Sequence, residues 1–221
     1  ALVPELRLRL AREAREIFQA AEALPLPADG VRLQPYWAFA WPGGQALARY
    51  VLDHPAVVEG KSVVDVGAGS GIASIAAARA GASGVLAADI DRCAAAAIAV
   101  NAALNGVAVA TTTEDVLGSM PAADVVLIAD LVYEPELATR VAAFFAEAAA
   151  SGRTVIMADR TTAGRPPQDF ELVAEYRAPL TPELQELHFE HARVWRLRAG
   201  SERRTAGARR SATDSKREPR T

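Results

Sequence analysis

Asp65-Val66-Gly67-Ala68-Gly69-Ser70-Gly71 is the stretch of this 221-residue sequence that decides the fold. It follows a short apolar run over 61–66, which predicts a buried strand, and it leads into an alanine-rich segment over 70–80, which predicts a helix. The three glycines let the backbone turn sharply and pass close to a ligand. A strand, a glycine turn and a helix in this order indicate a ligand-binding α/β unit.

Strand and helix patterns alternate outward from this stretch, with connections of a few residues. Such alternation predicts a parallel sheet covered on both faces, and right-handed crossovers make it doubly wound. The last two strands flank a proline-containing connection and predict an antiparallel pair that closes a mostly parallel, seven-stranded sheet. Asn101 and Asn105 are expected to cap or pack one helix. Expected strands are 61–66, 84–88, 107–112, 123–129, 154–158, 171–176 and 191–198; expected helices are 5–23, 70–80, 91–104 and 136–150.

The composition indicates one globular domain with flanking segments. Apolar residues make up 51% of the chain, and no apolar run approaches the roughly 20 residues of a membrane span. The single cysteine, Cys93, forms no disulfide framework, which favours a reducing, cytoplasmic compartment. We expect an N-terminal helix and loop over 1–30, the main domain over 31–198 and a disordered basic tail over 199–221. The tail carries seven Lys/Arg and three Asp/Glu, so the chain's net charge of −3 leaves −7 on the rest.

Acidic residues follow the predicted parallel strands, at the edge where ligands of such sheets bind. A carboxylate at Asp65, beside the glycine turn, repels a pyrophosphate and suits an ammonium group. Asp89 lies 22 residues beyond Gly67, at the distance that suits ribose hydroxyls. Glu114 and Asp115 follow the third strand, where they can accept from an adenine amino group. Together these residues predict a nucleoside that bears an uncharged or cationic group. The strand-end acids are Asp65, Asp89, Asp130 and Asp159.

The glycine spacing argues against a dinucleotide and therefore against a nicotinamide-dependent dehydrogenase. Dinucleotide loops have the pattern G-x-G-x-x-G, whereas here the third glycine comes one residue early and position 72 is isoleucine. The three histidines, His54, His188 and His191, lack metal-ligand spacing, so the sequence predicts no metal site.

The glycine loop and the run A-D-I-D at 88–91 resemble the class I S-adenosylmethionine-dependent methyltransferases, whose sheet is Rossmann-like. The stretch 35–47 (PYWAFAWPGGQAL) and the run D-L-V-Y at 130–133 resemble the protein lysine methyltransferases that modify the β-subunit of electron transfer flavoprotein. Gly164-Arg165-Pro166 and Val194-Trp195 fit the same family, and the resemblance covers about residues 2–198. It implies S-adenosylmethionine as cofactor. The cofactor-binding residues it implies are Trp41, Asp65, Gly67, Ala68, Gly69, Gly71, Asp89, Ile90, Glu114, Asp115 and Asp130.

The predicted catalytic residues are Asp130 and Tyr133. Methylation of lysine needs the neutral amine, which is roughly one lysine in a thousand near pH 7.4. A carboxylate raises the amine pKa, so Asp130 is interpreted as an acceptor that orients the amine rather than as a strong base. Tyr133 and Trp41 are expected to wall the pocket and to offer aromatic faces to a cation. The family resemblance also implies that the turn over 41–44 helps to enclose the cofactor. The structural alternatives are a cap on the following helix for Asp130, packing for Tyr133 and hydrophobic cover for Trp41.

The sequence leaves several acceptors open. The leading hypothesis is a protein lysine methyltransferase acting on the electron transfer flavoprotein β-subunit, and the first alternative is a ribosomal-protein methyltransferase. Nucleic-acid amino methyltransferases carry N-P-P-[FY] or D-P-P-Y where this chain has D-L-V-Y, which argues against nucleic acid. A small-molecule N-methyltransferase and a catalytically inactive cofactor-binding protein are further alternatives. A membrane partner is not expected.

Overall fold

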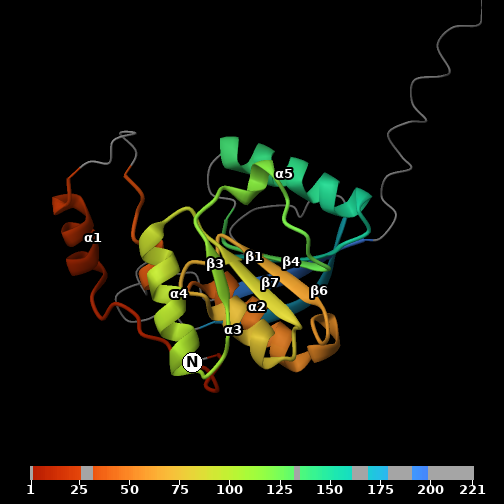
Figure 1. The fold of residues 1–221 in the computed structure, drawn as a ribbon, viewed down its shortest axis with the longest axis horizontal. Helices are drawn as coiled ribbons and strands as arrows, with labels where there is room; N and C mark the ends of the chain where they lie inside the picture. Colours follow the sequence, from red (N-terminus) through yellow and green to blue (C-terminus); the bar gives the residue numbers. More distant parts are fainter. Residues whose placement is uncertain (1, 26–31, 132–134, 161–168, 179–190, 199–221) are drawn as a thin grey trace, which may run out of the picture.

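The computed structural model describes residues 2–25, 32–131, 135–160, 169–178 and 191–198, and a seven-stranded sheet lies at its centre (Figure 1). The strands are β1 Ser62–Val66, β2 Gly84–Ala88, β3 Ala110–Thr112, β4 Val125–Ala129, β5 Thr154–Arg160, β6 Phe170–Arg177 and β7 His191–Leu197. They lie in the order β3-β2-β1-β4-β5-β7-β6. The first five are parallel, and β7 runs antiparallel to both β5 and β6. The predicted doubly wound sheet with its antiparallel closing pair is confirmed.

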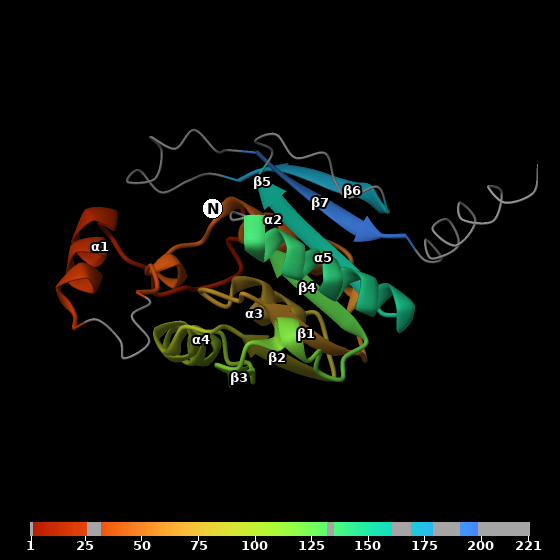
Figure 2. The ribbon, with the colours of Figure 1, turned by 90° about the horizontal axis from the view of Figure 1, so that it is seen from above.

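Helices cover both faces of the sheet. Figure 1 shows α5 on one face and α2, α3 and α4 on the other, and Figure 2 shows α1 standing apart from the sheet. None of the described helices is long and apolar enough to cross a membrane. The helices are α1 Ala14–Ala23, α2 Pro42–Asp53, α3 Ile72–Arg79, α4 Arg92–Leu104 and α5 Pro135–Ala150, with single 3₁₀ turns η1 Tyr36–Ala38, η2 Pro55–Val57 and η3 Val116–Gly118.

The buried side chains alternate along each strand and so divide into two cores. In β1, Val63 packs with α2 and α3, whereas Val64 and Val66 pack with α5. The alternation follows from the two-residue period of a strand. Asp65 shares the side of Val63, so its carboxylate is directed towards the layer that holds α2 and α3.

The expected helix over 5–23 is wrong in its first half, because α1 begins only at Ala14. The preceding residues form an extended arm that packs Val3 into the core. The run Leu6-Arg7-Leu8-Arg9-Leu10 alternates with a period of two, which suits extended chain better than a helix. Leu6 and Leu8 pack against the core that contains α2 and α3.

Two other boundaries differ from expectation. The third strand is confined to Ala110–Thr112 rather than 107–112, because its pairing with β2 begins at Ala110. The expected turn over 41–44 is instead the start of α2, in which Pro42 occupies the first helical position. Residues 26–30 of the expected N-terminal helix-and-loop segment over 1–30, and the expected tail over 199–221, lie outside the described residues.

Gly71 connects the glycine loop to α3 and has a left-handed conformation, with φ +79°. A Cβ atom there would also lie 3.0 Å from Cγ1 of Ile98, in α4. The Gly71→Ala substitution is therefore expected to lower the free energy of unfolding by about 1–3 kcal/mol.

Urea unfolding followed by circular dichroism measures this loss. Gly84→Ala is the matched control, because no atom lies within 4 Å of its added Cβ and its φ is not positive. An equal loss in the two variants would contradict the role assigned to the left-handed turn.

Candidate cofactor and transfer site

The glycine loop between β1 and α3 has a backbone conformation that favours glycine. Gly67, Gly69 and Gly71 all have positive φ, at +69°, +53° and +79°. The amides of Gly67 and Ala68 both donate to the carbonyl of Ala88, at 2.8 and 3.2 Å, which ties the loop to the end of β2. A Cβ at Gly67 would lie 2.7 Å from Cδ1 of Leu131. A side chain at Gly67 would therefore collide with Leu131, so the close packing of this loop requires glycine.

Asp89 lies at the end of β2 and fixes the middle of this loop. Its Oδ2 accepts from the Gly69 amide at 2.8 Å, and its Oδ1 accepts from the Asp91 amide at 3.0 Å. Burial raises the pKa of the carboxyl group, while the two amide hydrogen bonds lower it. A carboxylate has about four lone-pair positions, so further acceptor capacity remains for ribose hydroxyls. Ile90, directly after it, is 54% exposed and offers an apolar surface beside the loop.

Asp65 lies deeper than the sequence interpretation required. Its side chain is buried, and its Oδ2 accepts from Oγ of Ser74 at 2.5 Å, in the first turn of α3. Burial raises the pKa of Asp65 to about 6, the hydrogen bonds of Ser74 lower it, and the charge of Asp89 raises it. The carboxylate therefore anchors α3 behind the loop. Its predicted direct contact with an ammonium group stays a prediction.

Asp130 joins the end of β4 to the start of α2. Its Oδ2 accepts from the Gly43 amide at 2.7 Å, and its own amide donates to the carbonyl of Ala158 at 3.1 Å. Asp130 also has φ +50°, in the left-handed region that non-glycine residues seldom adopt. Asp130 thus binds the start of α2, 87 residues earlier in the chain. A cap on the following helix remains a structural alternative, because residues 132–134 lie outside the described residues.

The sequence places Gly43 in a stretch expected to enclose the cofactor, but it does not predict the contact with Asp130 that depends on this glycine. A Cβ at Gly43 would lie 2.6–2.8 Å from the carboxylate atoms of Asp130, which is too close for any side chain. No local pattern signals this constraint, because the two residues meet only in the folded chain. The contact brings the 35–47 stretch and the start of the 130–133 run to one place.

Trp41 immediately precedes α2 and belongs to a group of aromatic rings. Its indole N–H donates to the carbonyl of Tyr36 at 2.8 Å. Its ring centroid lies 5.8 Å from those of Tyr36 and Phe39, in edge-to-face contacts. Phe18 of α1 stacks on Phe39 at 6.1 Å. These contacts fit the interpretation of Trp41 as hydrophobic cover, and its part as a wall of the pocket stays a prediction.

The remaining predicted site residues are less closely associated with the loop. Asp115 accepts from the Leu117 amide and forms an exposed ion pair with Arg140 of α5, at 2.5 Å. Glu114 is exposed beside it. Their contact with an adenine stays a prediction. Tyr133 and the Gly164-Arg165-Pro166 landmark lie outside the described residues.

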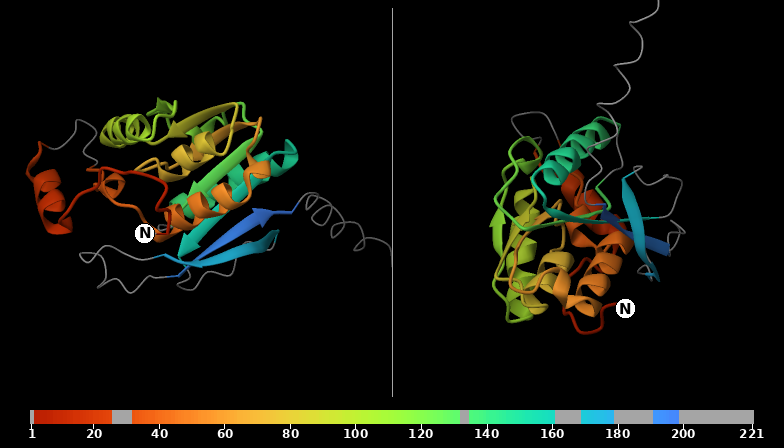
Figure 3. Two further views of the ribbon diagram at one scale, coloured as in Figure 1. Left: turned by 90° about the horizontal axis from the view of Figure 1, so that it is seen from below. Right: turned by 90° about the vertical axis from the view of Figure 1, so that its right-hand side faces the viewer.

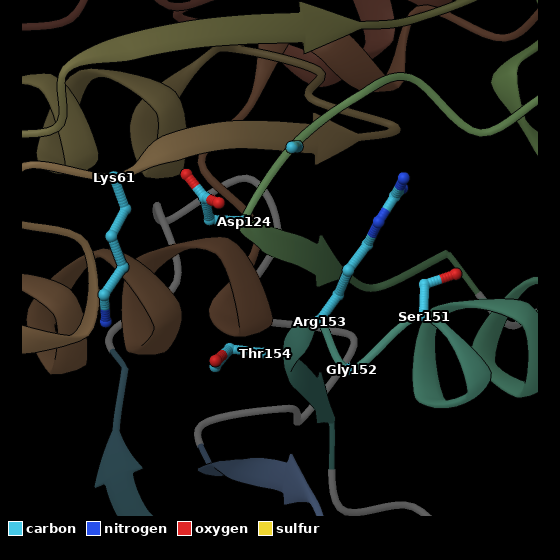
Figure 4. A pocket seen from close by; sticks show the side chains of 7 residues that line it. Lys61, Asp124, Ser151, Gly152, Arg153 and Thr154 are labelled. Carbon is cyan, nitrogen blue, oxygen red and sulfur yellow. The ribbon is translucent and has the colours of Figure 1, made fainter.

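A hollow of about 350 Å³ lies at the other edge of the sheet, where β1, β4 and β5 begin (Figure 4). Its charged groups already bind protein: Lys61 donates to the carbonyls of Ala56 and Val57, and Asp124 accepts from the amide and hydroxyl of Ser62. It is therefore separate from the candidate site. Within the described ranges, no group of three His, Cys, Asp or Glu side chains is placed to hold a metal ion.

Comparison with known proteins decides the family. The model described as "Ribosomal protein L11 methyltransferase (PrmA)" matches residues 45–163, more than half of the chain. The chain belongs to this methyltransferase family. A Mus musculus protein named electron transfer flavoprotein beta subunit lysine methyltransferase is 43% identical over 140 residues, which cover 62% of this chain and 52% of the relative. The chain thus spans about half the length of the curated relatives it matches, and the resemblance stated from the sequence is confirmed.

Solved structures show the same fold. A ribosomal protein L11 methylase from Lactobacillus delbrueckii has a TM-score of 0.50 at 24% identity, covering 71% of this chain and 78% of that one. A Thermus thermophilus 16S rRNA N2 G1207 methyltransferase, in complex with AdoMet and guanosine, has a TM-score of 0.53 at 18% identity, covering 72% of this chain and 43% of that one. At these identities the likeness establishes a methyltransferase fold and no more.

Because Asp65 is buried, the free energy of unfolding is expected to depend on pH. Its pKa of about 6 in the folded chain lies above the ordinary value of 3.8 for an aspartate, so the folded chain binds the proton more tightly. The free energy of unfolding therefore falls as pH rises from about 4 to 6. Relative to Asp65→Asn, the ligand-free wild type is expected to lose about 3 kcal/mol between pH 3 and pH 7.

Urea unfolding of both proteins across this pH range measures the difference. Asp124→Asn is a control, because hydrogen bonds from Ser62 lower the pKa of Asp124. The contribution of Asp124 to the free energy of unfolding therefore rises with pH, opposite to that of Asp65. Parallel stability profiles for the wild type and Asp65→Asn would show that burial does not raise the pKa of Asp65.

Proposed function

We propose that the chain is an S-adenosylmethionine-dependent protein lysine methyltransferase whose acceptor is the β-subunit of electron transfer flavoprotein. The observation that carries the proposal is the contact of Asp130 with Gly43, because it places a carboxylate where β4 ends and α2 begins. Leu131, the next residue, covers Gly67 of the cofactor loop. The carboxylate proposed to orient the acceptor amine therefore lies next to the loop proposed to bind the cofactor. The name of the mouse relative supports the acceptor.

The residues present suit S-adenosylmethionine. The loop carries glycine at three positive-φ positions, where the backbone has no side chain to keep a ligand away, and Asp89 offers acceptor positions for ribose hydroxyls. S-adenosylmethionine supplies an electrophilic methyl group on a sulfonium ion. The AdoMet bound to the T. thermophilus protein of the same fold supports this choice.

Asp130 is suited to orienting the amine of a lysine side chain. Its Oδ2 accepts from the Gly43 amide, which fixes the direction of the carboxylate, and a carboxylate is a group that can accept a hydrogen bond from an amine. The start of α2 carries a partial positive charge, which reduces the tendency of the carboxylate to keep the amine protonated. The amine can thus lose its proton to solvent and still be held in line for attack, where geometry supplies much of the rate.

The family model favours a second acceptor, ribosomal protein L11. One assay separates the two: the chain is incubated with methyl-labelled S-adenosylmethionine and with purified electron transfer flavoprotein, L11 or total RNA. We expect label on lysine residues of the flavoprotein β-subunit, located by mass spectrometry. Label on L11 alone would favour the second acceptor, and label on RNA alone would exclude both.

The position of Asp130 generates a prediction for Gly43→Ala. The added Cβ must displace the Asp130 carboxylate, and a displacement of about 1 Å at a reacting group costs about 100-fold in rate. We expect kcat to fall by about that factor, with the dissociation constant for S-adenosylhomocysteine changed by less than about threefold.

Asp130→Asn tests the charge separately, since the amide oxygen can still accept from Gly43 while the negative charge is lost. It is expected to lower kcat as well. Asp124→Asn, a carboxylate at the other edge of the sheet, is the control and is expected to keep wild-type kcat. Full activity of both Gly43→Ala and Asp130→Asn would exclude Asp130 from the transfer step.

A further inference from the structure

The N-terminal arm, residues 2–11, is bound along α4 by two asparagine side chains. The Arg7 amide donates to Oδ1 of Asn105 at 3.0 Å, and Nδ2 of Asn105 donates back to the Arg7 carbonyl at 2.6 Å. The Arg9 amide donates to Oδ1 of Asn101 at 2.7 Å. The side chains of the helix thus provide the partners that a neighbouring strand would provide.

The spacing explains why two asparagines four residues apart bind the arm. Four residues of helix rise about 6 Å, and two residues of extended chain span about 6.6 Å. Asn101 and Asn105 therefore face alternate residues of an arm that runs in the opposite direction to α4. The arm is also anchored at its start, where Glu5 pairs with Arg49 of α2 at 2.6 Å and Val3 is buried. In both views of Figure 3 the start of the arm lies beside α2, drawn in orange.

Asn101 connects the arm to the cofactor loop. Its Nδ2 donates to the carbonyl of Ser70 at 2.9 Å, and Ser70 stands between Gly69 and Gly71. Both Asn101 and Ser70 are buried, at 0% and 4% exposure. The amide side chain of Asn101 can accept from the Arg9 N–H through Oδ1 and donate to the Ser70 carbonyl through Nδ2 at once. The arm, Asn101 and the loop consequently form one continuous hydrogen-bonded path.

A second connection runs from the end of the arm to the same loop. The Ala11 amide donates to the carbonyl of Ala38, at the end of η1, at 2.9 Å. In that 3₁₀ turn, the Cα of Trp37 lies 3.8 Å from the Cβ position of Gly69. The arm is therefore connected to the glycine loop through Asn101 and through the 3₁₀ turn that contains Trp37.

We propose that Asn101 is a positioning residue for the cofactor loop and that the N-terminal arm sets its position. This inference rests on the proposed function, in that the loop is taken to bind S-adenosylmethionine and its product S-adenosylhomocysteine. Binding of the arm fixes the side-chain amide of Asn101, and this amide holds the backbone carbonyl of Ser70. The loop therefore keeps the conformation that the ligand needs. Because such coupling is reciprocal, ligand binding also holds the arm in place.

The test removes one backbone N–H group from the arm. Arg9→Pro deletes the N–H group that donates to Oδ1 of Asn101. Arg9→Ala keeps this N–H group while it changes the same exposed side chain. We expect Arg9→Pro to weaken S-adenosylhomocysteine binding by about three- to tenfold, the effect of one lost hydrogen bond, as measured by calorimetry. Arg9→Ala is expected to bind as the wild type does. All proteins are compared at a temperature where circular dichroism shows them folded.

Hydrogen exchange provides the reciprocal measurement on the full wild-type chain. S-adenosylhomocysteine is expected to slow exchange of the arm amides, and to slow it less in Arg9→Pro. A purely structural arm would lower the melting temperature of Arg9→Pro but leave both the affinity and the ligand-dependent protection unchanged, and that result would overturn the inference. Failure of the wild-type chain to bind S-adenosylhomocysteine at all would refute the proposed cofactor, and the coupling with it.

Discussion

The site depends on one kind of interaction, in which a carboxylate at the end of a strand binds a group at the start of a helix or in the glycine loop. Asp65 accepts from Ser74 at the start of α3, Asp89 from Gly69 in the loop, and Asp130 from Gly43 at the start of α2. The first amides of a helix lack partners within it, and its dipole favours negative charge there. These carboxylates therefore position the loop and both helices relative to the sheet.

The same interaction explains why positions that the sequence assigned to ligands also have structural partners. A carboxylate that binds one or two protein hydrogens keeps acceptor capacity, and its protein partners fix where that capacity points. Asp89 and Asp130 have this dual character at the loop and at the start of α2. Asp65 is the exception, because it is buried and its hydrogen bond with Ser74 anchors α3. Structural and functional interpretations of a strand-end acid are thus compatible at two of the three positions.

Patterns among residues close together in the chain predict the sheet, whereas contacts between residues far apart in the chain are not predicted by the sequence. The buried strands and the glycine turn are determined by residues adjacent in the chain, so periodicity and glycine placement were enough. The partners of Asp130 and Asn105 lie 87 and 98 residues away, and no local pattern names them. The arm was misassigned to a helix because Leu6 and Leu10 also fit a helical period. The alternation of leucine and arginine over 6–10 carried the correct signal.

Electrostatics give this edge of the sheet a preference for positive charge. Burial raises the pKa of both Asp65 and Asp89, and the charge of Asp89 contributes to the raised value at Asp65. Carboxylates that destabilise one another's ionised form gain most from a nearby cation, which lowers their pKa again. A sulfonium or ammonium group provides that compensation, whereas a pyrophosphate adds to the repulsion. The arrangement of these acids, more than the glycine spacing alone, therefore favours S-adenosylmethionine over a dinucleotide.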